Sequence, residues 1–167
     1  EDREVIVVVD RWTDVRTRIN PTVSGFSPFP DGDCRNPQIS ADGRFVVYAT
    51  NAGNLIEDNV GVPPDNAPYV VLHDMETGET SVATLAHDGS ALDKGFGGVN
   101  APDEFALSAD GRYLYFSSAS TNVHPERTAV ANQEWFWLYR RNLRTGEITI
   151  VSRAADGSIP GGNFTTP

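Results

Sequence analysis

The sequence predicts an all-β fold built from a repeated unit of four short antiparallel strands, with about two and a half units in 167 residues. Three observations carry this prediction. The chain contains an internal repeat of 68 residues, its short apolar runs are bounded by glycine and aspartate turns, and no helical periodicity is sustained over three turns.

The repeat is visible when the sequence is shifted by 68 residues, because separate motifs then align without a gap. The pentapeptide Ser-Ala-Asp-Gly-Arg at 40–44 falls on the same pentapeptide at 108–112. Further matches in this register are Asn54 with Asn122, Thr77-Gly78-Glu79 with Thr145-Gly146-Glu147, and Asp88-Gly89-Ser90 with Asp156-Gly157-Ser158. Independent motifs do not share one register by chance, so the chain contains a duplicated structural unit.

A partial third copy opens the chain. The segment "VIVVVDRWTDVRTRI" (5–19) matches the second half of the unit at 69–85. The sequence therefore predicts three parts: residues 1–30 carry the outer strands of one unit, residues 31–99 form a second unit, and residues 100–167 form a third.

Each unit is expected to contain four strands in the same order. In the first full unit they are "PQIS" (37–40), "FVVYAT" (45–50), "YVVLHD" (69–74) and "TSVATL" (80–85), with a long polar loop at 51–68. The second unit offers "FALS", "YLYFSS", "EWFWLYRR" and "ITIVSR" at matching places. An Asp-Gly pair flanked by apolar runs is a strong hairpin signal, so the first two strands of each unit should pair through "ADGR".

The repeated turn residues are interpreted as structural. Aspartate in a tight turn commonly hydrogen-bonds its own backbone, and glycine adopts positive φ without steric cost. The positions concerned are Asp42, Gly43, Gly78, Asp110, Gly111 and Gly146.

Near-continuous apolar runs such as "VIVVV", "FVVY" and "WFWLY" indicate sheets that are covered on both faces. Four-stranded antiparallel units repeated at a fixed period are typical of β-propeller blades. A two-sheet sandwich would also give short strands and turns, but it does not explain the repeat.

With these motifs the sequence resembles the blade repeat of TolB-like propellers. The resemblance rests on "ISADGRFVVYAT" followed by "YVVLHDMETGETSVATL", and it covers nearly the whole chain. It implies a protein of the bacterial periplasm or a secreted protein, and related blades form the non-catalytic propellers of prolyl-oligopeptidase-type peptidases. Closed propellers have about 4–8 blades, so this chain is too short to close a ring alone.

Composition excludes several classes of function. The net charge of −10 leaves no basic stripe for a nucleic acid. No apolar run reaches the 18 residues that a membrane span needs. A single cysteine rules out an intrachain disulfide, the three histidines lack zinc-site spacing, and no G-x-S-x-G motif is present.

One acidic loop carries oxygen ligands of the kind that calcium takes, namely Glu57, Asp58, Asp65 and Asn66. Their spacing does not match the helix-loop-helix calcium motif, so a solvated loop is the preferred interpretation, with no cofactor. Calcium stays as the alternative.

The most aromatic segment is "QEWFWLYRR" (133–141), where Trp135, Trp137 and Tyr139 are the candidates for contact with a partner. In a third strand the simpler role of these rings is packing against the neighbouring blade.

We therefore expect a non-catalytic binding or scaffold module, secreted or periplasmic, that contacts further blades or a protein partner through its loops at 51–68 and 119–134. It would act as an oligomer or as part of a larger chain. One alternative is the propeller portion of a hydrolase that gates a catalytic domain elsewhere. Another is a subunit of an assembly in which partial propellers complete one another.

Overall fold

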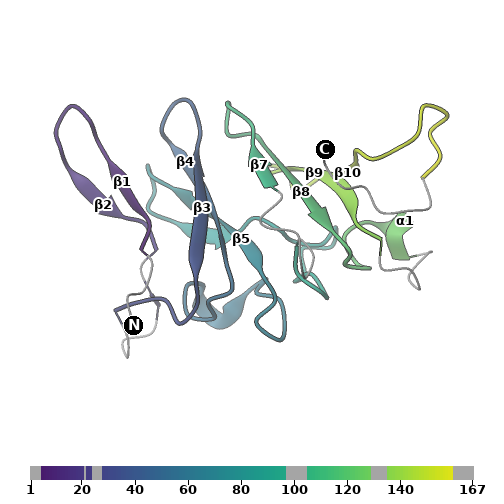
Figure 1. The fold of residues 1–167 in the computed structure, drawn as a ribbon, viewed down its shortest axis with the longest axis horizontal. Coiled ribbons are helices and arrows are strands. Elements are labelled where there is room, and N and C mark those ends of the chain that lie inside the picture. Colours follow the sequence, from purple (N-terminus) through teal and green to yellow (C-terminus); the bar gives the residue numbers. More distant parts are fainter. Residues whose placement is uncertain (1–4, 21, 24–27, 97–104, 129–134, 160–167) are drawn as a thin grey trace.

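The structure is a computed structural model that describes all residues except 1–4, 21, 24–27, 97–104, 129–134 and 160–167. The described chain is nearly all β, with a two-stranded and two four-stranded antiparallel sheets (Figure 1). Helix within it is confined to the short turns η1 (Glu57–Asn59) and α1 (Pro125–Thr128). None of these described helices is long and apolar enough to cross a membrane.

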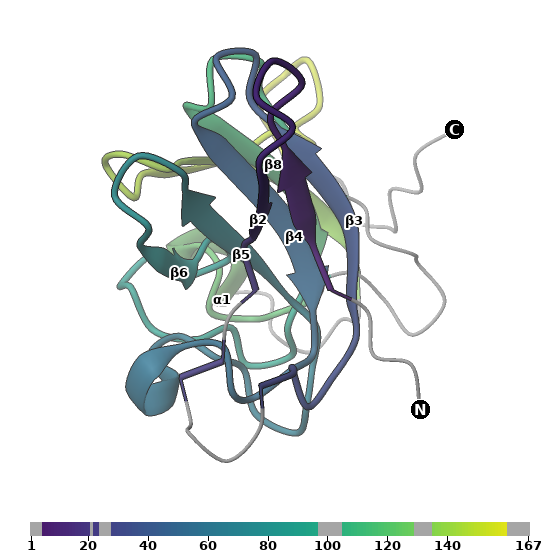
Figure 2. The same cartoon turned by 90° about the vertical axis from the view of Figure 1, so that its left-hand side faces the viewer.

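Strands follow one another within each sheet in chain order. The first sheet contains β1 (Val7–Val9) and β2 (Arg16–Arg18). The second contains β3 (Cys34–Ile39), β4 (Phe45–Thr50), β5 (Tyr69–Asp74) and β6 (Thr80–Val82). The third contains β7 (Phe105–Leu107), β8 (Tyr113–Ser118), β9 (Trp137–Asn142) and β10 (Ile148–Ile150). The sheets stand side by side in Figure 1 and one behind another in Figure 2. This arrangement confirms the predicted fold class, an incomplete propeller-like stack of four-stranded sheets.

The innermost strand β3 is longer than expected and irregular. It begins at Cys34, and its pairing with β4 shifts register between Arg35 and Gln38. Asn36 has a φ of 53°, and Pro37 has no backbone N–H for the ladder. A bulge at this dipeptide therefore allows pairing on both sides of the proline.

The outermost strands are shorter than expected, and both end in the same way. β6 stops at Val82 because the Thr84 hydroxyl, rather than a backbone carbonyl, accepts the hydrogen bond from Val70 N at 3.0 Å. In the last sheet the Ser152 hydroxyl accepts from Leu138 N at 3.2 Å. These side chains occupy equivalent repeat positions, so the local side-chain bond ends the ladder twice.

The middle sheet is covered on both faces. Val46 and Tyr48 of β4 belong to an apolar cluster shared with the first sheet, and Val47 and Ala49 belong to a cluster shared with the third. Neighbouring residues of a strand point to opposite faces, so the run "FVVYA" supplies both interfaces. This explains the absence of a simple apolar-polar alternation.

Polar bridges between described residues join the second and third sheets. Ala41 N donates to Ala109 O at 2.7 Å, which links the two Asp-Gly turns. The Gln38 side chain bonds the backbone of β7, and the buried Arg141 donates to Leu85 O at 3.0 Å. These bonds fix the spacing of the two sheets where a groove opens between their turns.

Candidate functional site

Each Asp-Gly turn is held by one serine and one aspartate. Ser40 Oγ donates to Asp42 Oδ1 at 2.5 Å and accepts from Phe45 N at 2.9 Å. Arg44 N donates to the same carboxylate oxygen at 3.0 Å. The second copy repeats these bonds through Ser108 and Asp110. The serine and backbone donors hold the pKa of each aspartate below its usual value.

The turn glycines that the sequence singles out all have positive φ. The values are 76° for Gly43, 76° for Gly78, 67° for Gly111 and 78° for Gly146. A side chain in this region of φ is strained, which explains the residue type at these positions.

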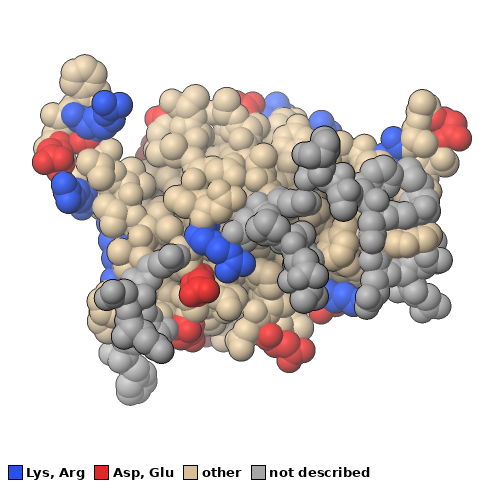
Figure 3. Space-filling model, in the orientation of Figure 1, with Lys and Arg blue, Asp and Glu red and all other residues tan. Residues whose placement is uncertain are grey.

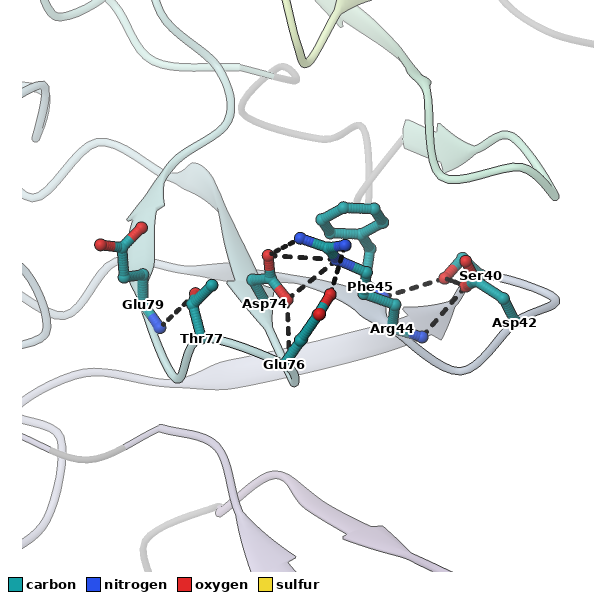
Figure 4. A network of polar contacts seen from close by, with 8 residues as sticks. All are labelled: Ser40, Asp42, Arg44, Phe45, Asp74, Glu76, Thr77 and Glu79. Carbon is teal, nitrogen blue, oxygen red and sulfur yellow. Dashed lines mark hydrogen bonds and ion pairs between the residues drawn. The ribbon is translucent and has the colours of Figure 1, made fainter.

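An ion-pair network joins the β3–β4 turn to the β5–β6 turn (Figure 4). The Arg44 guanidinium contacts Asp74 through Nη2 at 2.8 Å and through Nε at 3.2 Å, and its Nη1 contacts Glu76. The hydrogen bond from Arg44 lowers the pKa of Asp74 and raises that of Arg44 itself. Asp74 also accepts from Glu76 N at 2.9 Å, so the carboxylate shapes the turn as well.

A groove of about 930 Å³ lies beside this network, between the second and third sheets. Phe45 and Leu72 form the wall on the second sheet, and the β7–β8 and β9–β10 turns form the opposite wall. The side chains and backbone that line the groove belong to Arg44, Phe45, Leu72, Asp110, Gly111, Arg112, Asn142, Leu143, Arg144 and Thr145. It therefore combines apolar surface with several guanidinium groups.

The aromatic candidates lie mainly inside the molecule. Trp137 and Tyr139 are buried, with 1 % and 0 % of their surface exposed, and both belong to the cluster between the second and third sheets. Trp135 precedes β9 and is only partly buried against that cluster. Packing thus accounts for two of these rings, and Trp135 alone retains surface for a partner.

The acidic loop presents its four candidate residues to solvent. Glu57 and Asp58 are exposed in η1, and the exposed Asp65 and Asn66 follow in a turn of positive φ. Among the residues that the structure describes, no group of three or more histidine, cysteine, aspartate or glutamate side chains is placed to hold a metal ion.

Sequence reasoning missed the exposed apolar surface of the first hairpin. Trp12, at its tip, is 98 % exposed, and Val5, Val7 and Val9 are 40 to 44 % exposed. In Figure 3 charged side chains of both signs gather at the upper left, on this hairpin. The repeat alignment contained the signal for Trp12, because Glu76 and Arg144 stand at the equivalent turn positions.

Comparisons with known proteins add a distant likeness. No family model matches the chain, and no curated protein matches it. Among solved structures, the crystal structure of TolB from Acinetobacter baumannii is similar over 89 % of this chain, with 17 % sequence identity and a TM-score of 0.31. The match spans 38 % of the TolB chain. We therefore infer function from the geometry of this chain alone.

Proposed function

We propose that this chain is a non-catalytic binding and scaffold segment of a TolB-like β-propeller, and that its first sheet receives a further blade. The observation that carries the proposal is a row of exposed valines, Val5 and the β1 residues Val7 and Val9. Repeat alignment places Val5, Val7 and Val9 at the positions of Tyr69, Val71 and His73 in the second sheet. Those three side chains are 0, 0 and 6 % exposed, and Tyr69 and Val71 belong to the apolar cluster shared with the first sheet.

The exposed valine surface gives an energetic reason for another sheet to pack there. Completing the burial of a valine that is about two-fifths exposed contributes on the order of 1 kcal/mol. Single exposed apolar residues are ordinary, but three at alternate positions along one segment are the pattern of an interface. A second sheet packed on this face would repeat the interfaces already present in the molecule.

The edge of β1 supports the same proposal. In the second sheet β5 pairs with both β4 and β6, whereas β1 pairs with β2 as its only partner among the described residues. Unpaired backbone donors and acceptors at a strand edge favour the addition of another strand. The missing neighbour corresponds to the second strand of a blade.

A non-catalytic role agrees with the use of the carboxylates. The aspartates with lowered pKa are engaged by donors within turns or by arginine, as at Asp42, Asp74, Asp88, Asp110 and Asp156. Hydrogen bonds to the charged form stabilise the carboxylate and weaken it as a general acid or base near neutral pH.

The test is the oligomeric mass of the chain and of a variant that carries Val7→Lys and Val9→Lys. We expect size-exclusion chromatography with light scattering to show a mass that rises with concentration above the monomer value of 18.1 kDa. The lysine variant should stay monomeric, because charge on this face opposes sheet packing. Val60→Lys, at a more exposed valine outside the strands, is the control and should associate like the parent chain.

A parent chain that remains at the monomer mass over the whole concentration range would contradict the proposal. An equal loss of association in the Val60→Lys control would also contradict it, since association would then follow net charge rather than the β1 face.

A further inference from the structure

The groove between the second and third sheets carries an inference that is independent of the proposed function. We propose that it binds a small ligand in which a carboxylate is joined to an apolar body, with Arg112 and Arg144 holding the carboxylate. Three observations support this site: a difference between the two repeats, the donors that the difference leaves open, and the apolar wall opposite them.

The repeats differ at the positions that form the ion-pair network of Figure 4. In the first full unit Arg44 is held by Asp74 and Glu76. The equivalent residues in the next unit are Arg112, Asn142 and Arg144. Both carboxylates are therefore absent, and a second guanidinium stands where Glu76 stands in the first copy.

Arg112 lies over the following aromatic ring, as its counterpart Arg44 does. The Arg112 guanidinium carbon lies 5.2 Å from the centroid of the Tyr113 ring, as that of Arg44 lies 4.9 Å from the centroid of the Phe45 ring. An anion in the groove can thus meet Arg112 as Asp74 meets Arg44. Neither Arg112 nor Arg144 forms an ion pair with another residue in the part of the chain that the structure describes.

Asn142, which lines the same groove as the two arginines, adds a neutral donor. Its Oδ1 accepts from Arg144 N at 3.0 Å and from Thr145 N at 3.2 Å, so it shapes the turn as Asp74 does in the first copy. The side-chain amide nitrogen makes no hydrogen bond to a described residue, although Asn142 is only 7 % exposed and lines the groove. This nitrogen can donate to a carboxylate that lies between the guanidinium groups.

One carboxylate already lines the groove, that of Asp110. Its Oδ1 accepts from Ser108 Oγ at 2.5 Å and from Arg112 N at 3.0 Å. The third lining arginine, Arg44, is paired with Asp74 and Glu76. Excess positive charge therefore gathers at Arg112 and Arg144, in a chain whose net charge is −10. A bound carboxylate would offset this positive charge.

The opposite wall indicates what accompanies the carboxylate. Phe45 and Leu72 form this wall, Leu143 adds apolar surface beside Arg144, and all three are only partly buried. The volume of about 930 Å³ falls in the range of small-molecule sites, which are mainly apolar with a few placed polar groups. A compact aryl or alkyl carboxylate matches both walls.

The experiment is an NMR titration of the full chain with 3-phenylpropanoate, alongside 3-phenylpropanamide as the uncharged isostere. We expect 3-phenylpropanoate to cause saturable shifts of the backbone amide signals of Gly111, Arg112, Leu143 and Arg144. The isostere should bind at least about tenfold more weakly, since it lacks the charge-assisted hydrogen bonds.

Single-residue variants test which arginines bind the carboxylate. Arg112→Gln and Arg144→Gln should each weaken binding of 3-phenylpropanoate about tenfold, and Arg16→Gln on β2 should leave it unchanged. The double variant Asn142→Asp with Arg144→Glu rebuilds the network of the first copy, so it should abolish binding and raise the thermal midpoint. That rise would show that the loss of binding does not come from unfolding.

Three outcomes would overturn the proposal. They are the absence of a saturable shift with 3-phenylpropanoate, equal binding of the isostere, and arginine variants that bind like Arg16→Gln. None of them concerns the mass of the chain, so failure here and failure of the proposed function are distinguishable.

Discussion

At the scale of single residues, the pentapeptide at 40–44 and 108–112 acts as a turn and as a contact between sheets. Ser40 and Asp42 close the turn with short hydrogen bonds, and their counterparts Ser108 and Asp110 do the same. The turns also touch each other, because Ala41 N donates to Ala109 O. Identical sequences therefore experience different surroundings, and the glycines show the difference most clearly.

We predict that Gly111→Ala destabilises the protein more than Gly43→Ala. Both glycines have positive φ, so alanine at either position costs about 1 kcal/mol in backbone strain. A Cβ at Gly111 would lie 2.5 Å from Phe45 Cδ2, whereas a Cβ at Gly43 meets nothing within 4 Å. Overpacking should add about 1–3 kcal/mol at Gly111 alone, measured by urea unfolding. Equal losses for the two variants would contradict this packing.

At the scale of elements, the inner strands β3 and β7 of neighbouring sheets are joined by the side chain of Gln38, which forms the hydrogen bonds that a backbone peptide would form. Gln38 Nε2 donates to Phe105 O at 2.9 Å, and Gln38 Oε1 accepts from Leu107 N at 2.8 Å. One amide thus satisfies a donor and an acceptor of β7, as a backbone peptide would. Because Gln38 directly follows the bulge of β3, the irregularity and the bridge occur together.

We predict that Gln38→Leu lowers the free energy of unfolding by about 1–3 kcal/mol, since it leaves two backbone groups without their partner. The amide of Leu107 should exchange hydrogen faster in this variant. Ser81→Ala on β6, at an exposed position, serves as the matched control and should change neither quantity. Unchanged exchange at Leu107 in Gln38→Leu would show that the bridge does not hold β7.

At the scale of the whole molecule, the chain is a one-dimensional stack of sheets. One apolar cluster joins the first and second sheets, and another joins the second and third. The first sheet has two strands of three residues each, and its outward valines are exposed. Stability in such a stack is the sum of each sheet and its interfaces, so it should fall toward an end that lacks a neighbour.

We predict a gradient of hydrogen-exchange protection along the stack. Central residues of the four-stranded sheets, such as Val47 and Leu114, should be protected up to global unfolding. The amide of Val8 should exchange through local opening of β1–β2, because a two-stranded hairpin covered on one face is marginal in isolation. Equal protection at Val8 and Val47 would mean that the first sheet unfolds only with the rest.

Much of the fold could be predicted from the sequence, because the information is local and repeated. Hairpins follow from Asp-Gly pairs and from the β propensity of runs such as "FVVYAT". Each strand assignment is supported by the same pattern in both copies of the repeat. The strand ends were less predictable. Thr84 and Ser152 stop β6 and β10 through side-chain hydrogen bonds that apolar patterning does not register.

The candidate site was mostly beyond sequence reasoning. Aromatic residues drew attention to Trp137 and Tyr139, but these rings pack inside the molecule. The groove instead depends on Arg112 and Arg144, which are exposed residues that only the fold places in one groove with Phe45 and Leu72. Asn142 and Arg144 could have been noticed in the alignment as replacements for two acidic residues, yet their proximity to Arg112 required the fold.

The sequence by itself determined that this protein is a stack of duplicated four-stranded sheets, because strand pairing and turn geometry depend on residues that are close in the chain. The tertiary structure alone decided which faces stay open and where charge collects. Those properties depend on residues that lie far apart in the chain. Phe45 and Arg112, for example, meet in the groove only after folding, and the exposure of Val7 depends on whether another sheet covers it. The pentapeptide at 40–44 and 108–112 is identical in both copies, but only the packing of neighbouring sheets brings Asp110, Gly111 and Arg112 of its second copy into a groove with Arg44 of its first.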